Sequence, residues 1–296
     1  MGFKCYKLTF QNAHFGDGYL NTSKGSFPAS LLFSALCLEA LKNDCLDEFI
    51  AEAQQDDFFV SDAFPYVDEP YLPKPIGLYQ NKRLDFDTLA EDQRISKKAS
   101  ELTVLPYSQL MSFVEGDATI DDLYSDQVGL YDLEVLTKKG ADPYEVALTR
   151  FNSSLYIIAQ ASELFDQLMT SLQYSGLGGK RSSGYGAFSL EIAELNTDFL
   201  SHLNKFEYQR QLLLTTSLPK NNELTKSLLG AQYKLEKTSG FTYSETAGVL
   251  LRKNDLYKFS AGSVFLNPYL GSIVDVSPAN YAHPVYNFAK GLFYGF

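Results

Sequence analysis

Residues 175–186 read Ser175-Gly176-Leu177-Gly178-Gly179-Lys180-Arg181-Ser182-Ser183-Gly184-Tyr185-Gly186. Five of the eleven positions from Gly176 onward are glycine. Glycine carries no Cβ and adopts positive φ at little cost. Phosphate oxygens can therefore approach the backbone closely, and successive amide groups can form an anion-binding nest. We interpret this glycine-rich loop, residues 176–186, as a surface that holds ribose-phosphate.

The side chains of the loop favour the same interpretation. Lys180 and Arg181 supply positive charge. Ser182 and Ser183 supply hydroxyl donors, and Tyr185 offers a ring face to a base or a ribose. The alternative is an ordinary flexible turn after a helix. A lone glycine would favour that alternative, whereas five glycines beside these polar groups favour contact with RNA.

The flanks of the loop predict a helix before it and a strand after it. Ser162 can cap the helix, and apolar residues then recur on one helical face. These residues are Leu164, Phe165, Leu168, Met169 and Leu172. After the loop, Phe188, Leu190 and Ile192 alternate as in a half-buried strand. Walker A and dinucleotide-binding loops lead from a strand into a helix, so both of these motifs are excluded.

Further out, the pattern predicts the remaining elements of one folded unit. They are strands at 6–10, 58–60 and 155–159 and a helix at 29–42, which Pro28 opens. Ser26 is a possible cap for that helix. Residues 78–145 are polar, charged and weakly periodic, which predicts a long insertion that reaches outward. The resulting order of strands and helices is that of a ferredoxin-like βαββαβ unit, the layout of an RRM.

A second unit is expected after a polar link at residues 196–209. Strand-like runs follow at 212–216, 233–237, 256–259 and 273–276. We therefore predict an α+β fold with two ferredoxin-like (RRM-like) units. The first spans 1–205 with the thumb-like insertion at about 78–145, and the second, more degenerate, spans 206–296.

The net charge of −11 argues against nucleic acid when taken alone, because phosphate binding uses clustered Lys and Arg. The charges are, however, unevenly distributed. Residues 44–69 hold nine acidic side chains and no Lys or Arg. Residues 169–190, which include Lys180 and Arg181, hold no acid. This pattern suits a protein that binds RNA on one face and protein partners elsewhere.

The cysteines and the N-terminus indicate the compartment. The three cysteines, Cys5, Cys37 and Cys45, have no metal-ligand spacing, and their odd number argues against a disulfide framework. The first residues lack the apolar core of a signal peptide, and no run of about eighteen apolar residues exists. We therefore expect a cytoplasmic protein without a membrane segment.

Several segments carry a resemblance to known proteins. They are residues 10–16 (FQNAHFG), 62–65 (DAFP), 72–77 (LPKPIG), 149–151 (TRF), 171–186, 239–241 (SGF), 255–259 (DLYKF) and 273–276 (IVDV). Together they resemble the RAMP superfamily of CRISPR proteins, and within it the family of fourth Csm subunits of type III-A effector complexes, of the streptococcal kind. The resemblance covers nearly the whole chain and is weakest between residues 78 and 145.

This resemblance implies a non-catalytic subunit of a type III-A CRISPR-Csm complex that binds the repeat-derived 5′ tag of crRNA. It also implies contacts with the large polymerase-domain subunit and with the adjacent backbone RAMP subunit, target RNA being reached only indirectly. The loop 176–186 matches the RNA-contacting loop of the family. His14, Phe15 and Lys24 match the segment that faces the RNA groove. The insertion would correspond to a thumb-like hairpin that kinks the guide. No cofactor is implied.

Five further cations are candidates for RNA contact. Arg150, just before a strand, could contact a phosphate or pair with a nearby acid. Lys74, between two prolines, could reach RNA or a partner, or could be an ordinary surface lysine. Arg252, Lys253 and Lys258 could extend an RNA groove across the second unit, or could balance the acidic surface around them.

One alternative is a RAMP endoribonuclease that processes precursor crRNA without a metal. It would need a general base and a general acid, often His with Tyr or Lys. His14 is the one candidate, because His202 lies in the polar link and His283 precedes a proline. Asp17, between two glycines, is interpreted as a turn residue and not as a metal ligand. We therefore expect no catalytic residue and no metal site.

A second alternative is a generic RRM-like binder of single-stranded RNA. Such a protein would expose aromatic side chains on its central strands. Tyr6, Leu8 and Phe10 are instead expected to face the core.

Overall fold

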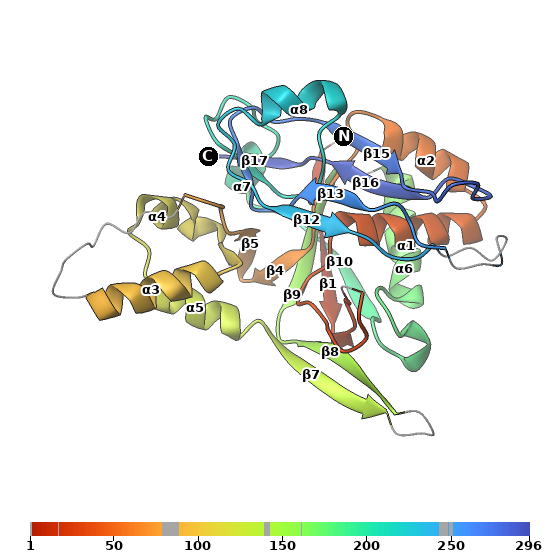
Figure 1. Cartoon of the computed structure of the whole chain (residues 1–296), viewed down its shortest axis with the longest axis horizontal. Coiled ribbons are helices and arrows are strands. Elements are labelled where there is room, and N and C mark those ends of the chain that lie inside the picture. The colour runs from red at the N-terminus through yellow and green to blue at the C-terminus, as the bar shows by residue number, and fades with distance from the viewer. Residues whose placement is uncertain are drawn as a thin grey trace.

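The computed structural model describes residues 2–16, 18–78, 89–138, 143–160, 162–242, 248 and 251–296, and of residues 89–92 only the backbone. Helices and strands are mixed along the chain, as the predicted α+β class requires (Figure 1). Among the described residues, none of the helices combines the length and the apolar character needed to cross a membrane.

A seven-stranded sheet forms the centre of the molecule. Its strands are β1 (Phe3–Phe10), β3 (Phe59–Val60), β4 (Phe64–Val67), β5 (Glu69–Pro73), β6 (Val104–Pro106), β9 (Ser154–Gln160) and β10 (Phe188–Ala193). They lie in the order β10-β1-β9-β4-β5-β6, with β3 also paired to β9. All of these pairings are antiparallel. In the register, Tyr6 lies opposite Ile157 on one side and Ile192 on the other.

One face of this sheet packs against helices. They are α1 (Ala29–Lys42), α2 (Leu46–Gln54) and α6 (Glu163–Ser175). Because side chains alternate across a strand, Tyr6, Leu8 and Phe10 all point from β1 to this face, where each is at most 3% exposed. The expectation that these three residues face the core is confirmed.

The helix starts show one expected cap and one unexpected cap. Ser162 caps α6, because its hydroxyl oxygen accepts a hydrogen bond from Phe165 N–H at 3.1 Å. Ser26 does not cap α1; its hydroxyl donates to a backbone carbonyl. The first amide of α1, that of Ala29, donates instead to Asp62 Oδ1 at 2.7 Å. The cap comes from a residue distant in sequence, which proximity along the chain could not reveal.

The region expected as an insertion is folded where the structure describes it. Its helices are α3 (Leu89–Glu101), the single turn η2 (Tyr107–Gln109), α4 (Leu110–Glu115) and α5 (Ile120–Val128). Leu110, Phe113 and Leu123 are buried in a core that they share with Leu72 and Tyr156 of the sheet. Two of these helices, α4 and α5, are short and bury few residues each, which weakens the periodicity of the sequence.

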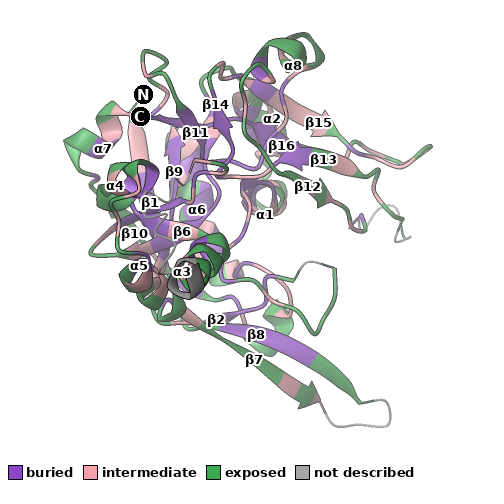
Figure 2. Ribbon diagram, turned by 60° about the vertical axis from the view of Figure 1, so that its left-hand side comes forward, coloured by how far each residue is buried: buried purple, intermediate pink, exposed green. Residues whose placement is uncertain are grey.

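A β-hairpin follows these helices and projects from the body of the molecule (Figure 2). It consists of β7 (Tyr131–Lys138) and β8 (Tyr144–Phe151), and the short strand β2 (Asn12–Ala13) pairs with β8. Most of β7 is exposed, whereas the middle of β8 is buried. The outward-reaching part of the expected insertion is therefore this hairpin.

The C-terminal residues, which we expected to form a second ferredoxin-like unit, form short helices and strands. Their elements are α7 (Thr197–Ser201), β11 (Gln211–Leu213), α8 (Asn221–Ser227), β12 (Leu235–Thr238), β13 (Leu256–Phe259), β14 (Val264–Phe265), β15 (Gly271–Asp275), β16 (Tyr286–Lys290) and β17 (Phe293–Gly295). In the described part of the chain they form three small sheets, β14-β11-β17, β12-β13 and β15-β16. Phe288 of β16 packs on Phe33 of α1, with ring centres 5.6 Å apart. This segment thus uses apolar residues to cover the first helices, which leaves fewer for a core of its own.

Candidate nucleic-acid interface

The base of the glycine-rich loop is anchored by backbone hydrogen bonds. Leu177 N–H donates to Gly186 O at 2.8 Å, which closes the loop on itself. Gly186 N–H donates to Asn12 O at 3.0 Å, and Gly179 N–H donates to His14 O at 2.9 Å. The Leu177 side chain is 1% exposed and belongs to the main core. The base is therefore a fixed part of the fold and not a flexible turn.

Two of the glycines are required by contacts within the protein. Gly178 has φ +95°, and a Cβ on it would lie 2.7 Å from His14 O. Gly186 has φ +80°, and a Cβ on it would lie 2.0 Å from Leu177 O. An L side chain would be strained at either position and would collide with backbone. The fold itself therefore requires glycine at these two positions, and contact of either residue with phosphate stays a prediction.

The tip of the loop, residues 180–185, is the part that reaches solvent. Lys180 adopts a left-handed φ of +58°, and the single turn η3 (Arg181–Ser183) follows it. Arg181, Ser182 and Gly184 are exposed. Ser183 N–H and Gly184 N–H each donate at 2.9 Å to a backbone oxygen of the tip. These two amides already donate within the tip, so fewer amides than predicted can form an anion-binding nest. The charged side chains therefore make up more of the surface that the loop presents to solvent.

The tip lies against the end of the β7–β8 hairpin. The Lys180 ammonium is 4.9 Å from the centre of the Tyr144 ring, and the Lys138 ammonium is 5.9 Å from the centre of the Tyr185 ring. Tyr144 is 46% exposed. Together with Arg181, these four residues are named here the cation–aromatic cluster. Cations and exposed rings side by side are what single-stranded RNA needs for its phosphates and its bases.

Lys138 and Tyr144 are functional candidates that sequence reasoning missed. The signal that could have found them is the alternation of apolar and polar residues on both sides of a short segment with Gly140 and Pro143. That pattern is typical of a hairpin, whose tip would hold both residues. The acidic composition of the surrounding sequence obscured it.

His14 and Phe15 lie beneath the loop and not on its surface. His14 is 6% exposed, and its Nδ1 lies 2.8 Å from Ala147 O of β8. Phe15 is 2% exposed and packs on Phe10 and Phe27. The prediction that Phe15 contacts RNA through its side chain is wrong, because the ring completes the core. The His14 ring and carbonyl instead join the loop to the hairpin.

Lys24 and Arg150 are exposed but have acidic neighbours. Lys24 Nζ lies 3.2 Å from Glu236 of β12, and both side chains are about half exposed, at 51% and 45%. The Arg150 guanidinium lies 3.8 Å from Glu134, and the Arg150 side chain is 66% exposed. Exposed ion pairs of this kind are weak and exchange readily with other partners. Contact with RNA stays a prediction for both residues.

Lys74 and Lys258 have structural roles that the sequence did not reveal. The Lys74 ammonium donates to Ala99 O at 2.8 Å and to Ser100 O at 3.1 Å, at the end of α3. Lys258 is fully buried, and its ammonium donates to Asn287 Oδ1 at 3.1 Å. Burial lowers the pKa of Lys258 to about 8. The prediction that Lys258 contacts RNA is wrong because solvent cannot reach it, and the ammonium of Lys74 is already occupied.

Arg252 and Lys253 lie next to β13 on a separate part of the surface. Arg252 is exposed and donates to Asp255 at 3.2 Å and to Ser239 Oγ at 3.3 Å. Lys253 is half-buried, and burial lowers its pKa. RNA contact stays a prediction for both residues. The ion pair of Arg252 with Asp255 agrees with the alternative that Arg252 balances the acidic surface around it.

The described residues hold no group of three or more His, Cys, Asp and Glu side chains that could bind a metal ion. Asp17 lies outside the described residues. His202 stacks between Tyr208 and Tyr294, with ring centres 4.6 and 5.0 Å away. His202 is therefore a packed residue of the C-terminal part and not a member of the loop surface.

Comparisons with known proteins agree with this fold and with each other. The family model described as CRISPR Csm4 C-terminal domain matches residues 207–296. The Csm4 protein of Streptococcus thermophilus is 42% identical over 304 residues, which cover 99% of both chains. Csm4 of Mycobacterium tuberculosis is 38% identical over 99% of this chain and 97% of its own.

Solved structures show the same fold. A chain of the Csm3-Csm4 subcomplex of the type III-A CRISPR-Cas interference complex matches 99% of this chain with a TM-score of 0.65 at 16% identity, with 99% of that chain covered. A chain of the Csm1-Csm4 cassette in complex with pppApA matches 99% of this chain and 97% of its own, with a TM-score of 0.64 at 18% identity. The family resemblance expected from short segments is confirmed by the identity over the whole chain. The chain therefore belongs to the Csm4 family of type III-A CRISPR-Csm complexes.

Proposed function

We propose that this protein is a non-catalytic, crRNA-binding subunit of a cytoplasmic type III-A Csm complex in antiviral defence. In this proposal it binds the repeat-derived 5′ tag of the crRNA. The observation that carries the proposal is the cation–aromatic cluster, in which Lys138 and Lys180 lie beside two tyrosines where the loop meets the hairpin, and Arg181 follows Lys180 in the exposed tip. The cations suit the phosphates of single-stranded RNA, and the rings suit its bases.

The proposed partners are the large polymerase-domain subunit and the adjacent backbone RAMP subunit. The solved structures that share this fold are of Csm4 assembled with Csm1 and with Csm3, which supports contacts with both kinds of subunit here. Within the acidic stretch 44–69, Asp47 and Glu48 are exposed on α2, and such acids suit a basic neighbour. In this arrangement the protein joins the large subunit to the backbone, and it meets target RNA only through the crRNA.

The first unit is proposed to be ferredoxin-like. The order β10-β1-β9-β4, with α1 and α6 on one face, corresponds to the order of the four strands in a βαββαβ unit, in which the fourth strand lies beside the first. The β7–β8 hairpin is the proposed thumb that kinks the guide, since it projects from this unit beside the loop (Figure 2). The small sheets of the C-terminal part lend no comparable support to a second unit.

The absence of catalysis is part of the proposal. His14 is the histidine nearest to the loop, and its burial and its contact with a backbone oxygen suit a structural role better than proton transfer to a ribose. Replacement of His14 by Ala is accordingly expected to leave the processing of precursor crRNA intact. Loss of processing would favour the endoribonuclease alternative.

The decisive experiment is crosslinking in the reconstituted complex. A crRNA with a photoreactive base in its 5′ tag is assembled with the full-length chain and the other subunits, irradiated and digested. The crosslinked peptides of this chain are expected to contain residues 180–185 or 138–144. Crosslinks confined to other surfaces, with none at the loop or hairpin, would overturn the proposal.

A further inference from the structure

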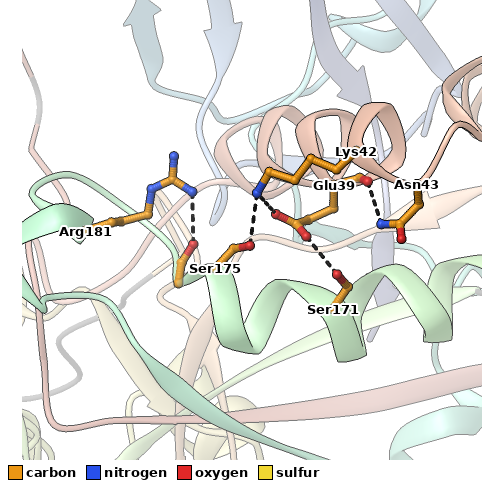
Figure 3. A network of polar contacts seen from close by, with 7 residues as sticks. Glu39, Lys42, Asn43, Ser171, Ser175 and Arg181 are labelled. Carbon is orange, nitrogen blue, oxygen red and sulfur yellow. Dashed lines mark hydrogen bonds and ion pairs between the residues drawn. The ribbon is translucent and has the colours of Figure 1, made fainter.

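The loop leaves α6 at its last turn, and a network of polar side chains holds that turn against the end of α1 (Figure 3). The Glu39 carboxylate, on α1, accepts a hydrogen bond from the Ser171 hydroxyl at 2.8 Å and another from the Lys42 ammonium at 2.7 Å. Lys42 also donates to the Ser175 hydroxyl at 3.1 Å. Glu39 therefore reaches both serines of the final turns of α6, one directly and one through Lys42.

Glu39 carries its charge in a buried position. Its exposed fraction is only 2%. Burial of a carboxylate is costly unless charged and hydrogen-bonding partners compensate for the lost water. Burial raises the pKa of the Glu39 carboxyl, but the contacts with Lys42, Ser175 and Ser171 outweigh it and hold the pKa below its ordinary value. The carboxylate is thus charged at neutral pH and satisfied by its partners.

Adhesion between the two helices does not require this network. α1 and α6 already share an apolar core that includes Leu36, Leu168 and Leu172. A buried ion pair can often be replaced by apolar side chains of similar volume without loss of stability. Apolar contacts have little directionality, whereas hydrogen bonds fix how one helix is rotated against another. The network therefore fixes how α6 is rotated against α1, and it contributes less to holding the two helices together.

The last turn of α6 leads directly into the loop, so its position fixes where the loop begins. Gly176 follows Ser175, the final residue of α6, and its N–H donates to Leu172 O at 2.8 Å. The Gly176 carbonyl accepts a hydrogen bond from the Arg181 guanidinium at 3.5 Å. A rotation of the last turn would therefore move Gly176 and, with it, an arginine of the tip (Figure 3).

We infer that Glu39 is a positioning residue for the glycine-rich loop. Through the last turns of α6 it sets the orientation in which the tip, residues 180–185, is presented to RNA. The effect on RNA rests on the proposed function, but the effect on the loop is a property of the chain by itself. The two effects can be measured separately.

The first measurement is hydrogen–deuterium exchange on the full-length chain. Glu39→Gln keeps the shape of the side chain and removes its charge, and Glu48→Gln, at an exposed acid of α2, is the matched control. In Glu39→Gln the amides of Leu177, Gly179 and Gly186 are expected to exchange about tenfold faster, because a charge-assisted network is lost. The amides of β9 report global stability and are expected to change little.

The second measurement is crRNA affinity in the reconstituted complex. Glu39→Gln is expected to weaken binding by about tenfold, and to add little to the double variant Lys180→Ala, Arg181→Ala. Fully additive losses would mean that Glu39 acts apart from the loop and would overturn the inference. Unchanged affinity in the double variant would instead count against the proposed function, and the exchange result would still decide the positioning.

Folding of the variants is checked by thermal unfolding. Should Glu39→Gln fail to fold, Ser171→Ala takes its place, because it removes one hydrogen bond to the carboxylate and leaves the ion pair with Lys42 intact. A smaller acceleration at the same three amides is then expected. Exchange at the loop base equal to that of the wild type in a folded variant would overturn the inference.

Discussion

The ammonium group of Lys180 lies 4.9 Å from the centre of the Tyr144 ring. Lys180 belongs to the glycine-rich loop, and Tyr144 is the first residue of β8. A second contact runs the other way, from Lys138 of the hairpin to Tyr185 of the loop, at 5.9 Å. Each segment thus supplies one cation and one ring, so the loop and the hairpin support each other where both reach solvent.

The double variant Lys180→Ala, Arg181→Ala is expected to weaken crRNA association without unfolding the chain. Both side chains lie on the tip and contribute little to the core, and each lost phosphate contact should lower the salt dependence of binding by about one unit of slope. Affinity is measured over a range of salt concentrations in the reconstituted complex. The control is Lys97→Ala, Lys226→Ala, which removes two exposed charges from α3 and α8. Equal salt slopes in the two double variants would contradict the assignment.

Tyr144→Ala is expected to weaken crRNA binding, whereas Tyr144→Phe is expected to preserve it. The phenylalanine keeps the ring that faces Lys180 and that can stack on a base, and loses only the hydroxyl. Loss of the ring should cost about 1 kcal/mol or more, which is about fivefold or more in affinity. Binding is compared by titration with labelled crRNA. If the two variants bind equally well, the ring has no role in binding.

The helix and the strand that flank the loop could be predicted because their signals are local. Ser162, the one-sided apolar pattern of α6, the glycines and the alternation of β10 all lie within about thirty residues of one another. The cap of α1 could not be predicted, since Asp62 reaches Ala29 only in the folded chain. The C-terminal strands were found, but not their sheets, because their pairing depends on which surfaces the first part leaves to cover.

At the candidate site, too, local signals were found from the sequence and long-range contacts were not. The loop was identified because glycine, lysine and arginine are adjacent in sequence. Lys258 was misjudged because a lysine in a strand looks alike whether its partner is phosphate or the buried Asn287. Tyr144 was missed because its importance comes from Lys180, which lies far along the chain. Charge and composition can suggest RNA contact, but burial and long-range pairing decide which residues are available for it.

Gly186→Ala is expected to destabilise the protein more than Gly184→Ala. Both glycines have positive φ, +80° and +86°, so alanine is strained at either one. At Gly184 a Cβ would meet nothing within 4 Å, and the expected cost is about 1 kcal/mol. At Gly186 it would lie 2.0 Å from Leu177 O, and the expected cost is about 3 kcal/mol or more. Urea unfolding of the two variants checks this order, and similar midpoints would contradict it.

The free energy of unfolding is expected to rise between pH 7.5 and pH 9 because of two buried lysines. Burial lowers the pKa of Lys258 to about 8, partly offset by Asp62, and burial lowers that of Lys290 to about 8. Above pH 8 the folded chain releases these protons while the unfolded chain, with ordinary lysines, still holds them. Stability therefore increases with pH, by about 1 kcal/mol for each lysine over this range.

The variant Lys258→Met measures how much of this rise in the free energy of unfolding comes from Lys258. The rise in this variant should be smaller than that of the wild type by about 1 kcal/mol, whatever its absolute stability, and Lys226→Met, at an exposed lysine of α8, should keep the full rise. The window ends near pH 9 because burial raises the pKa of Cys5 and of Cys37 to about 12. Above pH 9 the unfolded chain loses those thiol protons first, which offsets the further gain from the two lysines and ends the rise. Urea unfolding at intervals of half a pH unit measures the slope. An equal rise in Lys258→Met and the wild type would mean that Lys258 titrates in the folded protein as it does in water.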